Sequence, residues 1–250
     1  MRRRIAEDLS PAMLTEGVYT AHTCHLFVRD CAWSFAHEHD AAIQSHWQRR
    51  VAANPSFFNG RILIADDACL SDGVLSASMI EVDFAAFLYW RDQGRKAPPA
   101  FDTFGSGIVR TRDGAILLGQ QSTGNLNAGM LYPPGGFIDP RDIDAQGNID
   151  ITRSIRREVA EEFGIGDWLP RPCGDFIVTI YGRQIAIARI FDLNWNADEA
   201  IERMRGFLAS DADGELEDVV AVRTQADLND LPLPAYARVL LTHVFEMTHP

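Results

Sequence analysis

Short apolar runs alternate with longer stretches of helical spacing in the first hundred residues. The alternation predicts three strands and two helices, and therefore a small α/β unit. The first helix should stop at Asn54-Pro55, because the residue before a proline avoids helical geometry. The second helix is capped by Asp83 and ended by Gly94. The expected strands lie at 22–28, 61–65 and 74–82, and the expected helices at 34–53 and 83–93.

A polar stretch that contains two prolines interrupts this pattern at 94–102. Such a stretch is typical of a connection between domains and predicts a boundary at about residue 100. We therefore expect a small N-terminal α/β domain over 1–100 and a second domain over 101–250.

The remaining pattern predicts two hairpins, three helices and one further strand. Asp113-Gly114 favours a tight turn in the first hairpin, and Gly182-Arg183 separates the strands of the second. The expected strands lie at 107–112, 115–118, 176–181, 184–191 and 219–223, and the expected helices at 151–163, 197–208 and 234–247.

Three glutamates fall on one face of the helix expected at 151–163. Glu158, Glu161 and Glu162 are spaced i, i+3 and i+4, which places their side chains together. Crowded carboxylates repel one another unless a cation lies among them, and oxygen ligands suit Mg²⁺ or Mn²⁺. The alternative interpretation is a solvated acidic helix face, which is a common feature of surface helices.

The residues around these glutamates carry a family resemblance. Gly135-Gly136 lies about twenty residues upstream, where glycine lets a loop backbone approach phosphate or metal. Arg157 precedes the first glutamate, and Gly164-Ile165 follows the last. The segment resembles the signature of the Nudix hydrolases, G-x5-E-x7-R-E-U-x-E-E-x-G-U, with U an aliphatic residue. The second half of the signature matches at every specified position.

The resemblance implies an α/β/α sandwich with a mixed sheet over about residues 102–248. It also implies that Glu158, Glu161 and Glu162 bind a divalent metal, Mg²⁺ or Mn²⁺, and that Arg157 helps to orient them. Glu161 and Arg157 would accordingly belong to the catalytic residues.

Two further features of the site follow from the same resemblance. Gly135 and Gly136 would form the loop at the substrate phosphates. Nudix enzymes often take a further base or ligand from a carboxylate outside the helix, and the acidic run 213–218 is the expected source. Our preferred residue in that run is Glu217, and the alternative is an exposed acidic turn.

The first half of the signature departs from the family pattern. Asp142 occupies the position of the first glutamate, and fourteen residues rather than seven separate it from Arg157. A lengthened polar loop at 141–149 accounts for the difference without disturbing the helix. Asp142, Asp144 and Asp150 are all open as the first carboxylate, as is the absence of that role.

Composition narrows the function further. A net charge of −12 argues against non-specific binding to nucleic acid or anionic membrane, and an acidic protein that handles phosphates needs metal ions. The four cysteines form no CxxC pair and are expected to be reduced. The basic start of the chain turns acidic before any long apolar run, and no run of about 18 apolar residues follows, so we expect a cytoplasmic protein.

The expected reaction is cleavage of the diphosphate linkage of a nucleoside diphosphate joined to another moiety. A nucleotide sugar is the first choice, because 54–60 and 87–90 loosely resemble leader segments of Nudix proteins that act on such substrates. Rival substrates are a dinucleoside polyphosphate, a coenzyme or a nucleoside triphosphate. A nucleotide-binding or regulatory module without turnover is the rival from another class. A homodimer formed through the leading domain stays open.

Overall fold

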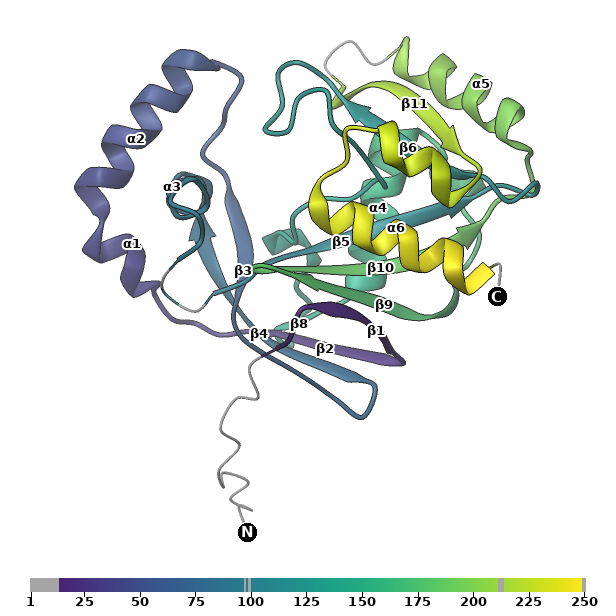
Figure 1. Cartoon of the computed structure of the whole chain (residues 1–250). Coiled ribbons are helices and arrows are strands. Elements are labelled where there is room, and N and C mark those ends of the chain that lie inside the picture. Colours follow the sequence, from purple (N-terminus) through teal and green to yellow (C-terminus); the bar gives the residue numbers. More distant parts are fainter. Residues whose placement is uncertain (1–13, 97, 99, 211–213, 249–250) are drawn as a thin grey trace.

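The structure is a computed structural model that describes residues 14–96, 98, 100–210 and 214–248 (Figure 1). The basic start of the chain and residues 97 and 99 of the expected boundary lie outside the described residues. Among the helices that are described, none combines the length and the apolar character that crossing a membrane requires.

The chain is divided here into a first part, up to about residue 100, and a larger second part that follows it. A mixed sheet of seven strands forms the centre of the second part. Its order is β1-β9-β10-β5-β6-β11, with β7 added beside β6. The central pair, β5 and β10, is parallel, and the other pairs are antiparallel. The strands are β1 Gly17–Ala21, β5 Asp102–Arg110, β6 Ile116–Gln121, β7 Leu131–Tyr132, β9 Cys173–Tyr181, β10 Gln184–Asp192 and β11 Leu216–Val222.

Helices cover both faces of this sheet, because successive strand residues point to opposite sides and both sides are apolar. Val109 packs into the core shared with α4 (Ile151–Phe163) and α5 (Ala197–Leu208), whereas its neighbour Ile108 packs into the core under α6 (Ala235–Thr248). Figure 1 shows α6 in front of the sheet and α4 behind it. The expected α/β/α sandwich is confirmed.

A smaller sheet lies beside the sandwich, in the order β3-β4-β2-β8. A further hydrophobic core, separate from the two on the faces of the larger sheet, lies against this smaller sheet. It contains the large buried side chains Phe87 and Trp90 of α3. The elements of this part are β2 Thr23–Val28, α1 Ser34–Glu38, α2 Asp40–Ala53, β3 Arg61–Ser71, β4 Val74–Asp83 and α3 Phe84–Asp92, and β8 Asn148–Ile149 joins them from the lengthened loop.

Each part of the chain supplies one strand to the sheet of the other. β1, near the start of the described chain, pairs with β9 of the larger sheet, and β8 pairs with β2 of the smaller one. A bridge between Ala65 and Phe101 connects the two parts as well. The division into domains at about residue 100 stays a prediction.

The predicted elements agree closely with the observed ones where the pattern is strong. The helices at 151–163 and 197–208 have the predicted bounds. The helix predicted at 34–53 is interrupted at His39, whose backbone leaves helical geometry with φ −114° and ψ 15°. The strand predicted at 61–65 continues to Ser71, and three short strands, β1, β7 and β8, were not predicted.

Two glycines in β5 let α4 lie close to the sheet. A Cβ atom at Gly105 would lie 2.7 Å from Ile155 Cγ1, and one at Gly107 would collide with Val159 Cγ2. Ile155 and Val159 are fully buried residues of α4. The small residues therefore set the distance between the sheet and the helix that carries the three glutamates.

Gly107→Ala is expected to lower the free energy of unfolding by about 1–3 kcal/mol, because the added methyl group overpacks the contact with Val159. Gly206→Ala is the matched control, since a Cβ there would meet nothing within 4 Å and the residue lies in α5. The control should be neutral or gain up to about 1 kcal/mol. Urea unfolding of both variants checks this, and equal effects would contradict it.

Candidate active site

The glycine loop after β7 lies directly against the glutamates of α4. The backbone N–H of Gly135 donates a hydrogen bond of 3.1 Å to Glu162 Oε2. A Cβ atom at Gly136 would collide with the carboxylate of Glu158, and one at Gly135 would collide with the carbonyl oxygen of Gly105. Only glycine at both positions permits this close approach.

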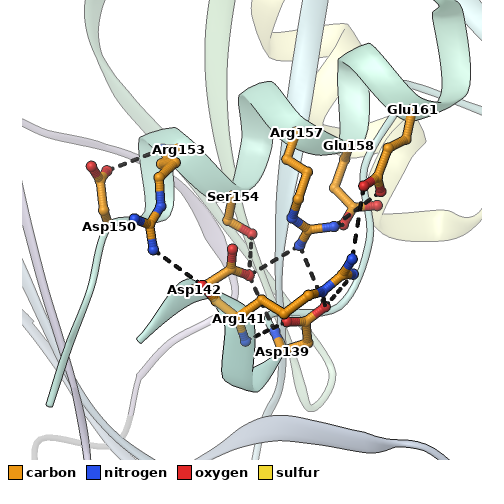
Figure 2. Close-up of polar contacts among 9 residues, drawn as sticks. All are labelled: Asp139, Arg141, Asp142, Asp150, Arg153, Ser154, Arg157, Glu158 and Glu161. Carbon is orange, nitrogen blue, oxygen red and sulfur yellow. Dashed lines mark hydrogen bonds and ion pairs between the residues drawn. The ribbon is translucent and has the colours of Figure 1, made fainter. Parts of the chain in front are cut away.

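Arg157 links the helix glutamates to the lengthened loop, as Figure 2 shows. Its Nη1 lies 2.6 Å from Glu158 Oε1 and 3.0 Å from Glu161 Oε2. Its Nη2 lies 3.1 Å from Asp142 Oδ2. Its Nη2 also lies 3.7 Å from Asp139 Oδ2, so one guanidinium group contacts two of the three glutamates and two aspartates.

Asp142 is the aspartate of the loop that reaches this network. It is 2% exposed and accepts hydrogen bonds from Ser154 Oγ at 2.8 Å and from the backbone N–H of Asp139 at 3.2 Å. Asp144 instead closes the loop by accepting from backbone N–H groups at 146 and 148, and Asp150 caps α4. Of the three aspartates that the sequence leaves open, Asp142 is the one in contact with Arg157 (Figure 2).

The buried carboxylates lack sufficient positive charge. Glu162 is 6% exposed, and its Oε1 has no hydrogen-bond partner among the described residues. Burial raises the pKa of Glu162 well above its usual value, and the charges of Glu215 and Glu158 add to this. Burial also raises the pKa of Glu158 to about 7, although Arg157 opposes the change. Such shifts are typical of sites that bind a cation or exchange protons.

Glu215 is a fourth carboxylate at the site. The residue is exposed as a whole, yet burial of its carboxyl group raises its pKa, and the charge of Glu161 raises it further. Glu217 is exposed and lies in β11, where the pairing with β6 shifts register between Leu216 and Asp218. The structure thus brings Glu215 to the helix glutamates. The sequence alone does not distinguish the two glutamates, because both belong to one short acidic run. Residue 213 of that run lies outside the described residues.

A cleft of about 640 Å³ opens beside the glycine loop and Glu215. This volume suits a ligand the size of a nucleotide. Both parts of the chain line it, and aromatic rings form much of its walls. Lining residues include Phe57, Phe58, Phe84 and Arg91 from the first part and Phe104, Tyr132, Gly135, Gly136, Glu215 and Tyr236 from the second.

Comparisons with known proteins give matches among solved structures. No protein-family model matches the chain, and no curated protein matches it. A bifunctional NMN adenylyltransferase/ADP ribose pyrophosphatase from Francisella tularensis, complexed with AMP and a Mn ion, is 18% identical with a TM-score of 0.43. The alignment covers 64% of this chain but 46% of that protein, so the chain spans less than half of its length.

Two smaller proteins are matched over most of their length. A MutT protein from Methanosarcina mazei is 22% identical with a TM-score of 0.36, over 58% of this chain and 93% of that one. A Nudix hydrolase from M. smegmatis is 16% identical with a TM-score of 0.36, over 58% of this chain and 85% of that one. The solved structures to which this chain is similar thus include one that is named a Nudix hydrolase.

Asp142→Ala is expected to lower the free energy of unfolding by about 3 kcal/mol, because it leaves Arg157 without one partner in a largely buried network. Asp175→Asn, at an exposed position of β9, is the control and should change stability little. Urea unfolding measures both. A loss below about 0.5 kcal/mol in Asp142→Ala, within the range of ordinary surface changes, would show that the network does not stabilise the fold.

The metal-free protein is expected to lose stability as the pH rises from about 4.5 to 7. In this window folded Glu158 retains a proton that the unfolded chain has released. The free energy of unfolding therefore falls as the pH rises, by at most about 1.4 kcal/mol per pH unit for one group. Glu158→Gln should flatten the slope, whereas Glu202→Gln at an exposed position of α5 should not. Urea unfolding in EDTA at several pH values tests this, and an unchanged slope in Glu158→Gln would refute it.

Proposed function

We propose that the chain is a Nudix-type hydrolase that uses Mg²⁺ or Mn²⁺ to cleave the diphosphate linkage of a nucleoside diphosphate joined to another moiety. One observation carries the proposal. The largely buried carboxylates of Glu158 and Glu162 lie against the glycine loop, which lines a cleft of nucleotide size, and Glu162 has no ion-pair partner among the described residues.

The residues fit a hard divalent cation. Glu162 Oε1 is a buried carboxylate oxygen without a hydrogen-bond partner among the described residues, and Glu158 lies beside it on α4. Carboxylate oxygens are the ligands that Mg²⁺ and Mn²⁺ prefer. Glu158, Glu161 and Glu162 would hold the ion, with Gly135 and Gly136 along the substrate phosphates. A bound ion would neutralise charge on the phosphoryl oxygens and activate a water molecule.

Arg157 and Asp142 act in this proposal as positioning residues. Arg157 contacts Glu158 and Glu161 and so sets the directions of their side chains. Asp142 holds Arg157 from the lengthened loop and takes the place of the first glutamate of the signature. The insertion therefore changes the path of the loop but keeps a carboxylate beside the arginine.

Glu215 is our candidate for the additional base or ligand, in preference to Glu217. Its charge acts on both Glu158 and Glu162, and its raised pKa keeps it closer to the range in which a carboxylate exchanges protons near neutral pH. Glu215 also lines the cleft. The products would be a nucleoside monophosphate and a phosphorylated remainder.

The preferred substrate class remains a nucleotide sugar. The cleft offers aromatic rings for a nucleobase and also polar groups, including Asp102 and Gln184. Asp102 is buried and accepts hydrogen bonds from Arg95 at 2.8 Å and from the side-chain amide of Gln184 at 3.1 Å. Such a polar pair suits the hydroxyl groups of a sugar.

A nucleotide-binding module without turnover is the second candidate, and one observation favours it. Among the described residues, no three carboxylate, imidazole or thiol groups already lie together as an ion would require. Arg157 instead occupies Glu158 and Glu161. In this alternative the arginine replaces the metal permanently.

The discriminating experiment measures release of nucleoside monophosphate from nucleotide sugars, dinucleotides and nucleoside triphosphates with Mg²⁺, Mn²⁺ or EDTA. Glu161→Gln and Glu162→Gln are each expected to lower turnover by more than about a hundredfold, since loss even of groups that only support metal ligands costs ten- to a hundredfold. Glu202→Gln on the exposed face of α5 should retain full activity. Folded protein that binds a nucleotide but turns over no substrate would favour the binding module.

A further inference from the structure

Arg91 is a cation that lines the cleft and forms no ion pair with a carboxylate of the described residues. It lies near the end of α3, in the first part of the chain, and lines the cleft that contains the glycine loop and Glu215. No carboxylate among the described residues lies within ion-pair distance of its guanidinium group. Arg95, which lines the same cleft, is different, because its Nη2 lies 2.8 Å from Asp102 Oδ2.

A neutral side chain from the second part holds Arg91 in place. Arg91 Nη2 donates a hydrogen bond of 2.7 Å to Asn127 Oδ1. Asn127 belongs to the loop between β6 and β7, lines the cleft and lies beside the Tyr132 hydroxyl. The amide orients the guanidinium group across the cleft without neutralising it, so the remaining N–H donors are available to a ligand.

The surroundings of Arg91 are unfavourable for an unpaired charge. The side chain is half-buried. Burial lowers the pKa of Arg91 and the neighbouring charge of Arg95 lowers it further, although the charges of Asp92 and Asp102 oppose this change. A half-buried cation that is not paired directly with a carboxylate is costly, and an anion bound in the cleft would offset that cost. Guanidinium groups bind phosphate well, because their planar N–H groups match two oxygens at once.

The charge pattern of the cleft indicates where such an anion would lie. Arg91 and Glu215 line the same cleft, and the cleft-lining Gly135 donates its backbone N–H to Glu162. A diphosphate whose phosphoryl oxygens approach a metal on the carboxylate side would present its other oxygens to Arg91. The phosphates would then bridge the two parts of the chain.

We infer that Arg91 binds a phosphoryl group of the substrate and that Asn127 positions it for this contact. The inference rests on the proposed function for the identity of the ligand. It assigns the first part of the chain a direct place in the substrate site, and it makes Arg91 a determinant of selectivity for diphosphates over uncharged nucleosides.

Calorimetric binding of ADP, UDP and GDP, and of the corresponding nucleosides, tests this inference in Mg²⁺ and again in EDTA. Arg91→Gln should weaken binding of the nucleoside diphosphate about ten- to a hundredfold and leave nucleoside binding unchanged. Arg91→Lys should retain part of the affinity, because it keeps the charge but loses the planar donors. Arg49→Gln, at an exposed position of α2, is the matched control and should bind like the unaltered protein.

The outcomes separate this inference from the proposed hydrolysis. Binding that depends on Arg91 without turnover of any substrate would support the phosphate contact and contradict the hydrolase. Turnover with unchanged KM and unchanged diphosphate affinity in Arg91→Gln would overturn the phosphate contact alone. The phosphate contact would also be overturned if no nucleoside diphosphate binds to the unaltered protein. Thermal unfolding of each variant shows whether it is folded. If Arg91→Gln does not fold, the diphosphate affinity of Arg91→Lys decides whether Arg91 contacts phosphate.

Discussion

The glutamates of α4 bring two carboxylates out of water beside each other, and the fold can keep them there only if positive charge is supplied. Arg157 supplies part of it, and the position of the arginine in turn depends on Asp142. The lengthened loop has to fold back onto α4 for that contact. The glycine loop can approach the glutamates because Gly135 and Gly136 carry no side chains. The positions of Arg157, of the lengthened loop and of the glycine loop are thus all linked to the repulsion between the carboxylates of α4.

The sequence predicted the parts of the molecule that depend on local patterns. The 3.6-residue periodicity gave α4 and α5 their bounds, and the spacing of Glu158, Glu161 and Glu162 placed them on one helix. The sandwich was expected from the resemblance to the Nudix signature, which is itself a local pattern. These features succeed because each depends on residues within a few positions of one another.

Features that depend on distant partners could not be predicted in this way. β1 and β8 are too short to give a clear strand pattern, and they are held by pairing with β9 and β2. Glu215 is held at the site by a backbone hydrogen bond of 2.9 Å from Ser122, which is distant in the sequence. Arg91 looks like an ordinary surface arginine in the sequence, and its significance appears only when α3 is placed against the second part. In each case a long-range contact, rather than local propensity, decides the outcome.

The exchange of strands between the two sheets has a consequence for how the chain acquires its structure during synthesis. β1 leaves the ribosome long before β9, so the larger sheet cannot be complete while the first part alone has emerged. Until then β1 has no partner, and β2 lacks its short neighbour β8 along one edge. Unpaired strands of this kind invite association with other nascent chains. The first part of the chain therefore depends on strands of the second part to cover its unpaired edges. The risk of misassembly is greatest during the time in which the ribosome translates the residues between β1 and β9.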